Sequence, residues 1–442
     1  MAKPFAKQSL LRYTIVAICA GIVVLVLFTN VLWASSYANP LSKRSVHESE
    51  RKVLTINKET VISFCGPKSN LRWIDQALII RKARQLENVK EERDTQKEKA
   101  KNFPNEDNAL ELEWEEMAEA PVPRLDGAGI QIGNLFYVFA GYGTIDLVHS
   151  HVDVYNFTDN TWGGRFDMPK DMAHSHLGMV TDGRYIYIVT GQYGPQCRGP
   201  TALNFVLDTK TKKWSSLPAL PVPRYAPATQ LWRGRLHVMG GSKEDRHEPA
   251  LEHWSIAVKD GKAVESEWKS EIQIPRGGPH RACIVVDDRL LVIGGQEGDF
   301  MAKPGSPIFK CSRRSEVVYS DVYMLDGEGI WKQLPSMPKP DSHIEFAWVV
   351  VNNSIVIVGG TTEKHPVTKR MVLIGDIFQF DLNVLEWRII GKTPYRLKTT
   401  LVGLWEGWLY FTSGQRDKGV HDSSPKKVLG KTWRTKLHLP VQ

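Results

Sequence analysis

Cysteine is scarce in this sequence, and no two cysteines stand in a metal-binding arrangement. The 442 residues contain five of them, with no CxxC pair and no zinc-finger spacing. One lies in an apolar N-terminal segment, and the other four are compatible with zero, one or two disulfides. A zinc-finger scaffold is therefore not expected. The cysteines are Cys19, Cys65, Cys197, Cys283 and Cys311.

Several motifs that carry chemistry are also absent. The sequence has no GxSxG, no P-loop and no HExxH, so it lacks the signatures of α/β-hydrolases, P-loop NTPases and zinc metalloproteases. The net charge of +8 is spread along the chain without a basic block or an Arg/aromatic motif, so we expect no nucleic-acid partner. No cofactor and no metal is assigned.

One long apolar run is present, at residues 13–33 (YTIVAICAGIVVLVLFTNVLW). Its 21 residues carry no charge, and roughly 20 apolar residues suffice to span a bilayer as a helix. Lys3, Lys7 and Arg12 precede it, so the positive-inside rule places the tail 1–12 in the cytosol and the rest across the membrane. The alternative is a signal peptide cleaved near Ala34. We expect a single-pass type II membrane protein.

Two other features fit a lumenal body. Asn156 and Asn352 each begin an N-x-S/T triplet and are candidate glycosylation sites, although such triplets also arise by chance. Residues 34–107 contain no repeat and include a helix-forming, charged stretch at 69–102. We expect this region to be a stem with a solvated helical stalk, the alternative being a coiled coil.

Internal repeats dominate the remainder. Six times a turn leads into an apolar strand that ends in glycine, with spacings of 50, 50, 54, 65 and 54 residues. A second apolar strand follows each of the first five glycines, and then a tryptophan and a proline, so that each unit carries four short strands. The glycines are Gly141, Gly191, Gly241, Gly295, Gly360 and Gly414, and the tryptophans are Trp162, Trp214, Trp268, Trp331 and Trp387.

The sixth unit lacks its final strand, and a candidate for it precedes the first unit. Residues 110–117 alternate Leu or Trp with Glu, which is the period of a strand. The strand is acidic, whereas its proposed partner carries Lys431, Arg434 and Lys436. We therefore expect the two ends of the chain to pair and close a ring.

These repeats resemble the kelch repeat over residues 108–442. The glycines after the second strand and the tryptophan of the fourth match that family, whose units of about 50 residues form propeller blades. The resemblance implies an all-β, six-bladed kelch-type β-propeller, closed by an N-terminal strand and preceded by one transmembrane helix and a helical stem. The chain departs from galactose oxidase, because we find six units rather than seven and no matching Tyr/His copper set. It also has no BTB or F-box-like segment.

Binding surfaces in such propellers gather where the loops between blades meet the axial channel. Counting back seventeen and fifteen residues from each motif glycine places charged and polar residues at one mouth of this channel, with further cations nearby. The candidate ligand-binding residues are Arg124, Asp126, His174, His176, Arg224, Arg276, His280, Arg281, His343, Glu345 and Arg396.

Three interpretations of these residues remain open. Arg124 and Arg224 with their neighbours form an anion- or glycan-binding mouth. Alternatively, His176, His280, Asp126 and Glu345 form an acid/base or metal site. The third interpretation is a water-filled channel with ordinary polar walls.

The layout of tail, anchor, stem and propeller resembles that of plant membrane-anchored kelch-repeat proteins of the galactose oxidase/kelch superfamily. By analogy with Golgi type II proteins, we expect a Golgi membrane location with a lumenal propeller. The expected function is a binding or interaction module for a protein or glycan ligand, including acidic glycans or glycoproteins. The alternative is a lumenal sugar-modifying enzyme, epimerase- or oxidase-like, with its site at the propeller mouth and no catalytic residue assigned.

Overall fold

The computed structural model describes residues 111–144, 146–195, 198–299, 317–365, 371–417, 427–437 and 439. Contacts divide the chain into two units, Met1–Glu87 and Asn88–Gln442, and every described residue belongs to the second. The expected anchor, the stem and four of the five cysteines lie outside the described residues. Within these ranges, no helix has the length and hydrophobicity to cross a membrane. The remaining cysteine, Cys283, is a free and buried thiol.

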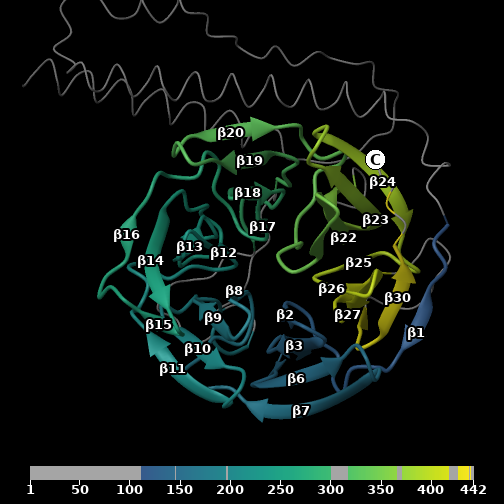
Figure 1. Cartoon of the computed structure of the whole chain (residues 1–442), viewed down its shortest axis with the longest axis horizontal. Coiled ribbons are helices and arrows are strands. Elements are labelled where there is room, and N and C mark those ends of the chain that lie inside the picture. The colour runs from purple at the N-terminus through teal and green to yellow at the C-terminus, as the bar shows by residue number, and fades with distance from the viewer. Residues whose placement is uncertain are drawn as a thin grey trace, which may run out of the picture. The chain divides into compact units, whose positions relative to one another are not determined.

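The described chain is built from strands, which confirms the all-β expectation. Its six largest sheets are arranged around a common centre (Figure 1), and we call them blades 1 to 6 in the order in which their innermost strands occur in the sequence. Blade 1 has the order β2-β3-β6-β7, and blades 2, 4 and 5 have the same meander. Blade 3 adds a short hairpin strand, and blade 6 takes its outermost strand from the other end of the chain.

The innermost strands surround the centre and are short. They are β2 (Ala128–Ile132), β8 (Gly178–Thr181), β12 (Ala228–Trp232), β17 (Ala282–Val286), β21 (Trp348–Val351) and β26 (Leu401–Trp405).

The second strands are the most deeply buried, because sheets of neighbouring blades cover both of their faces. In five blades, four of their five residues are buried, which explains why they read as continuous apolar runs rather than as an alternation. They are β3 (Leu135–Phe139), β9 (Tyr185–Val189), β13 (Arg235–Met239), β18 (Arg289–Ile293), β22 (Ser354–Lys364) and β27 (Trp408–Thr412).

The outer strands are progressively more exposed. The third strands are β6 (His151–Asn156), β10 (Asn204–Asp208), β14 (His253–Lys259), β19 (Val322–Leu325), β23 (Met371–Asp381) and β30 (Thr432–Lys436). The fourth are β7 (Thr161–Asp167), β11 (Lys213–Leu217), β16 (Lys269–Ser270), β20 (Trp331–Leu334), β24 (Glu386–Lys392) and β1 (Glu115–Met117). Small additions are β4 (Tyr142–Thr144), β5 (Leu147–Val148), β15 (Lys262–Ala263), β25 (Leu397–Lys398), β28 (Gln415–Arg416) and β29 (Lys427–Val428).

The two ends of the chain pair in blade 6. Strand β1 is antiparallel to β30 and places Glu115 opposite Arg434. The Arg434 guanidinium lies 2.7 Å from the Glu115 carboxylate, and Lys431 forms an ion pair with Glu116. The strand is shorter than the 110–117 expected, but the acidic and basic side chains meet as the sequence indicated.

The repeat tryptophans connect neighbouring blades by hydrogen bonds as well as by packing. In five blades the indole N–H of the outer tryptophan donates to a backbone carbonyl at the end of the preceding blade's outer strand. The pairs are Trp114 to Lys392 (2.9 Å), Trp162 to Ala118 (2.8 Å), Trp214 to Asp167 (3.1 Å), Trp268 to Pro218 (3.0 Å) and Trp387 to Pro335 (2.9 Å). In blade 4, the buried indole nitrogen of Trp331 has no hydrogen-bond partner among the described residues.

This difference supplies a matched test of the indole hydrogen bond. Trp214→Phe removes the N–H that bonds to the Asp167 carbonyl, whereas Trp331→Phe removes an N–H that is already unpaired. We expect Trp214→Phe to reduce the free energy of unfolding by about 1 kcal/mol more than Trp331→Phe. Urea unfolding followed by circular dichroism measures both. Equal losses would show that the tryptophans act by apolar packing alone.

Candidate functional site

Six residues, one before each innermost strand, form a ring around the axis. All have positive φ, between 46° and 64°, a conformation that side chains other than glycine seldom adopt. At four of these positions, the backbone N–H donates to the backbone carbonyl of the preceding ring residue. The ring consists of Asp126, His176, Ala226, His280, His343 and Thr399, with bonds from His176 to Asp126 (3.2 Å), Ala226 to His176 (3.1 Å), His280 to Ala226 (3.2 Å) and Thr399 to His343 (3.2 Å).

A second set of backbone bonds uses the motif glycines. The N–H of Gly141 donates to the His174 carbonyl in the next blade at 2.7 Å, and Gly414 of blade 6 donates to Arg124 of blade 1 at 2.8 Å. Both glycines have positive φ, 86° and 96°, and a Cβ at Gly414 would lie 2.5 Å from the Lys398 carbonyl oxygen. Glycine is therefore needed here for both conformation and space.

In blade 5, the number of residues between the ring position and the motif glycine is two larger than in the other blades. The ring position there is His343, and not Glu345 as the count from Gly360 indicated. Glu345 and Phe346 are an insertion between the ring and β21, with a turn closed by a 3.2 Å bond from Ala347 N–H to the Ile344 carbonyl. The count failed because it assumed a constant length for this connection.

The predicted anion-binding arginines lie inside the protein, in ion pairs. Arg124 is 1% exposed and pairs with Asp153, and Arg224 is 1% exposed and lies 2.9 Å from the Glu252 carboxylate. Arg281 pairs likewise with Asp321 at 2.9 Å. Each guanidinium is thus neutralised by a carboxylate of this chain, which leaves little of its charge for a ligand.

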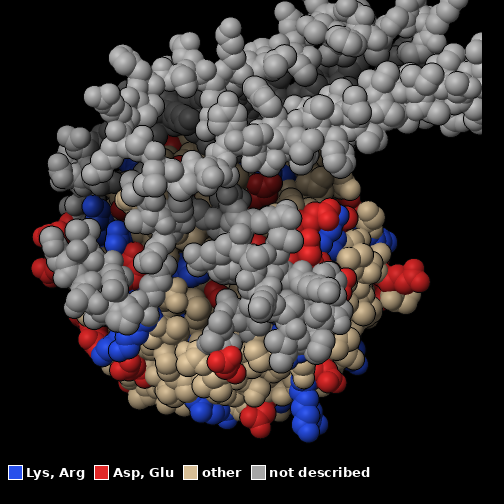
Figure 2. Space-filling view, turned by 180° about the vertical axis from the view of Figure 1, so that it is seen from behind, with Lys and Arg blue, Asp and Glu red and all other residues tan. Residues whose placement is uncertain are grey.

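The remaining predicted residues lie nearer the surface or in loops. Arg276 covers the Tyr319 ring at 3.8 Å, and Arg396 lies 3.2 Å from the Asp417 carboxylate; both are only partly buried. His174 is buried and accepts a 3.0 Å bond at Nδ1 from the Gly194 N–H. Figure 2 shows positive and negative side chains interspersed over the described part of one face.

The structure brings His176 and His280 together in a buried polar network. At its centre is the Tyr225 hydroxyl, which lies within hydrogen-bonding distance of His176 Nε2, 2.8 Å from Asp299 Oδ2 and 2.9 Å from an Arg246 nitrogen. Burial raises the pKa of Tyr225 well above its usual value, so the phenol stays protonated. The network is a set of hydrogen bonds around a neutral hydroxyl.

His280 occupies the point where this network meets the blade 5 insertion. Its Nδ1 contacts the Glu345 carboxylate, its Nε2 lies 3.5 Å from Asp299 Oδ2, and its ring stacks on His343 with centroids 4.0 Å apart. Burial acts to lower the pKa of His280, but the charges and hydrogen bonds of Glu345 and Asp299 raise it to about 9. Burial lowers the pKa of His343 well below its usual value. A charged imidazole therefore stacks on a neutral one.

His176, His280 and Asp299 each offer a ligand atom, and these atoms lie within 4.8 Å of one another. The surroundings do not favour a cation there. The Tyr225 hydroxyl bonds to two of the three, and the Arg246 guanidinium lies 3.6 Å from Asp299. The protonated His280 adds a second positive charge, so the donor set favours an internal hydrogen-bond network.

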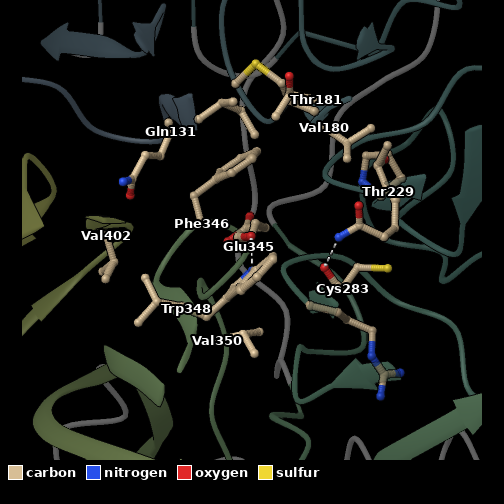
Figure 3. Close-up of a pocket in the computed structure, with 18 of the residues that line it drawn as sticks. Gln131, Val180, Thr181, Thr229, Cys283, Glu345, Phe346, Trp348, Val350 and Val402 are labelled. Atoms are coloured by element: carbon tan, nitrogen blue, oxygen red, sulfur yellow. Dashed lines mark hydrogen bonds between the residues drawn. The ribbon is translucent and has the colours of Figure 1, made fainter. Parts of the chain in front are cut away.

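A cavity of about 400 Å³ follows the ring along the axis and is lined by the innermost strands of all six blades. Phe346, Glu345 and Trp348 from the blade 5 insertion and β21 lie in its middle, with Val402 to one side and Cys283 to the other (Figure 3). Glu345 therefore touches both the cavity and His280. A void of about 10 Å³ between Asp126, His176, Glu345, Phe346 and Thr399 is about the size of one water molecule.

Sequence reasoning missed several of these residues. Arg246 and Asp299 come from the variable loops that follow Gly241 and Gly295, where no repeat pattern exists. Phe346 and Trp348 were missed because the spacing in blade 5 was taken as regular. Only Tyr225 could have been found from the sequence, because it directly follows Arg224, one of the candidate ligand-binding residues.

The raised pKa of His280 predicts a specific pH dependence. Relative to its ordinary value of 6.5, a folded pKa of about 9 makes protonation stabilise the fold by up to about 3 kcal/mol. This contribution is complete below pH 6.5 and is lost as the pH rises through 9. Unfolding free energies from pH 6 to 10 should decline in the wild type and decline less in Glu345→Gln. Glu248→Gln, at an exposed carboxylate, should follow the wild type, and parallel curves for all three proteins would contradict the assignment.

Comparison with known proteins gives the family. The sequence matches the KLHDC2/KLHL20/DRC7 Kelch-repeats domain over residues 127–360. It is 68% identical over 329 residues to a kelch repeat-containing protein of Arabidopsis thaliana, covering 74% of this chain and 77% of that protein.

More distant matches agree. A kelch repeat and BTB domain-containing protein of Vaccinia virus is 23% identical over 52% of this chain and 37% of its own. The solved structure of YjhT superposes with a TM-score of 0.54 at 14% identity, over 72% of this chain and 95% of its own, which shows a shared fold. With the repeats, the sheets around one axis and these matches together, the chain belongs to the kelch-repeat family.

Proposed function

We propose that this protein is a binding module whose propeller takes part of a partner molecule into its axial cavity. The observation that carries this proposal is the cavity of about 400 Å³, to which all six innermost strands contribute. That volume lies within the usual range of ligand pockets, about 300–1,000 Å³. Several lining residues, including Gln131, Thr181 and Leu404, are partly exposed, which supports access from solvent.

Binding is favoured over catalysis by the burial of the titratable groups. His176, Tyr225, His280 and Asp299 form hydrogen bonds with one another and are at most 7% exposed. A substrate would have to displace these hydrogen bonds to reach them. The pairing of Arg124 and Arg224 with carboxylates of this chain likewise disfavours an acidic glycan held by these two side chains.

We propose further that the propeller lies on the lumenal side of a Golgi membrane, anchored by residues 13–33. The support is the distribution of positive charge around that segment. The sequons offer a test because they differ in environment. Asn352 is exposed in the turn between β21 and β22, whereas the Asn156 amide bonds to Asp159 and Asn134 and is followed by the buried Phe157.

We expect Asn352 to carry a glycan in native cells. Treatment of the full-length protein with a peptide-N-glycosidase should increase its electrophoretic mobility, and Asn352→Gln should abolish most of that shift. Asn156→Gln is the control, with a smaller effect because its side chain is engaged. If the wild-type mobility does not change, the lumenal placement loses its support.

Filling the cavity tests the binding function itself. Val350 lines the cavity, whereas Val384 is 46% exposed in a turn outside it. We expect Val350→Trp to reduce the recovery of cross-linked partners of the full-length chain by at least about tenfold, and Val384→Trp to leave it unchanged. Thermal unfolding checks that both variants fold. Recovery of the same partners by both variants would rule out the cavity as the binding site.

A further inference from the structure

We infer that the axial cavity accepts an aromatic ring that carries one hydrogen-bond donor, such as the side chain of a tyrosine or tryptophan of a partner polypeptide. This inference rests on the proposed binding function and specifies the chemistry of its ligand. It follows from three properties of the cavity: its aromatic walls, the internal hydrogen bonds of most of its polar side chains, and the position of Glu345.

Aromatic and aliphatic side chains form the walls around the centre of the cavity. Phe346 and Trp348 are both partly exposed and lie beside Val350 and Val402 (Figure 3). The Trp348 indole is held in place by a 2.9 Å bond from its N–H to the Glu345 carbonyl. These two aromatic side chains favour a planar partner, because rings gain from offset or edge-to-face stacking beyond the area that they bury.

Three of the four hydroxyl and amide side chains of the wall are already engaged within the propeller, whereas the buried Thr229 hydroxyl has no hydrogen-bond partner among the described residues. Gln131 donates to the Leu404 carbonyl at 2.7 Å and accepts from the Leu404 N–H at 2.9 Å, which links blades 1 and 6. Gln230 donates to the Cys283 carbonyl at 3.1 Å, linking blades 3 and 4. Thr181 donates to the Tyr185 carbonyl at 2.7 Å. A hydroxyl-rich sugar would leave most of its own polar groups unpaired here, and desolvation would oppose its entry.

Glu345 gives the cavity one acceptor at its polar end. One carboxylate oxygen contacts His280, which is buried behind it, and the side chain also lines the cavity. The other cavity-lining ionic group among the described residues, Arg281, is 1% exposed and paired with Asp321. A phenol or indole can donate to this carboxylate, whereas an anion would meet it without an accessible cation.

The test uses small fluorinated probes and the full-length chain. We would titrate 5-fluoroindole, 4-fluorophenol, fluorobenzene and 4-fluorobenzoate, following the ¹⁹F resonance of each probe. We expect 5-fluoroindole and 4-fluorophenol to bind more tightly than fluorobenzene, and 4-fluorobenzoate to bind most weakly. Tighter binding of the benzoate, or no binding of any aromatic probe, would overturn the inference.

Variants assign the binding to the cavity. Val350→Trp and Leu404→Trp both fill the cavity, and each should raise the Kd for 5-fluoroindole by at least about tenfold. Val384→Trp should leave this Kd unchanged. Glu345→Leu should remove the advantage of fluorophenol over fluorobenzene. Unchanged affinity in both filled variants would place the probe elsewhere and reject the inference.

The two proposals fail differently. If cross-linked partners disappear in Val350→Trp but no aromatic probe binds the wild type, the cavity is a binding site for a different chemistry and this inference is wrong. If partners are unchanged in Val350→Trp, the proposed function is wrong, whatever the probes do.

Discussion

The ring of backbone hydrogen bonds around the axis is the constraint on which the rest of the structure depends. Its six residues have positive φ, and none of them is glycine. Such conformations cost about 1–3 kcal/mol each unless their surroundings stabilise them. Here the bonds from one ring residue to the next, and those from the motif glycines to the neighbouring blade, provide that stabilisation.

At the outer rim, side chains instead of the backbone form hydrogen bonds between neighbouring blades. Indole N–H groups of five tryptophans reach the carbonyls of the preceding blade, and the bond from Trp114 to Lys392 extends this pattern to the strand from the N-terminal end of the propeller. Blades 6 and 1 are therefore joined near the axis by the bond from Gly414 to Arg124. At the rim, the two ends of the chain are joined by the pairing of β1 with β30. Closure covers the edge of β30, which would otherwise be unpaired.

The axis divides into a polar and an apolar part, and the insertion in blade 5 marks the boundary. On one side, Arg246, Asp299, His280 and Glu345 follow one another with alternating charge, and the Tyr225 hydroxyl bonds to the first two. On the other side, Phe346 and Trp348 face the cavity. Glu345 belongs to both parts. A ligand in the cavity would therefore contact Glu345, whose partner His280 keeps its proton at neutral pH because its pKa is raised to about 9.

The sequence by itself determined the repeat architecture, because spacings such as that from Gly141 to Gly191 and alternations such as Leu110 to Trp114 are local and periodic. It also located most of the ring positions. Only the tertiary structure decided that Arg124 and Arg224 pair with Asp153 and Glu252, that His343 replaces Glu345 in the ring, and that Tyr225 meets Asp299 across 74 residues of sequence. The contact of Tyr225 with Asp299 and the position of His343 depend on a loop of variable length and on an insertion. Arg124 pairs with Asp153 in strand β6, and the order of residues along the chain does not show which side chains face each other.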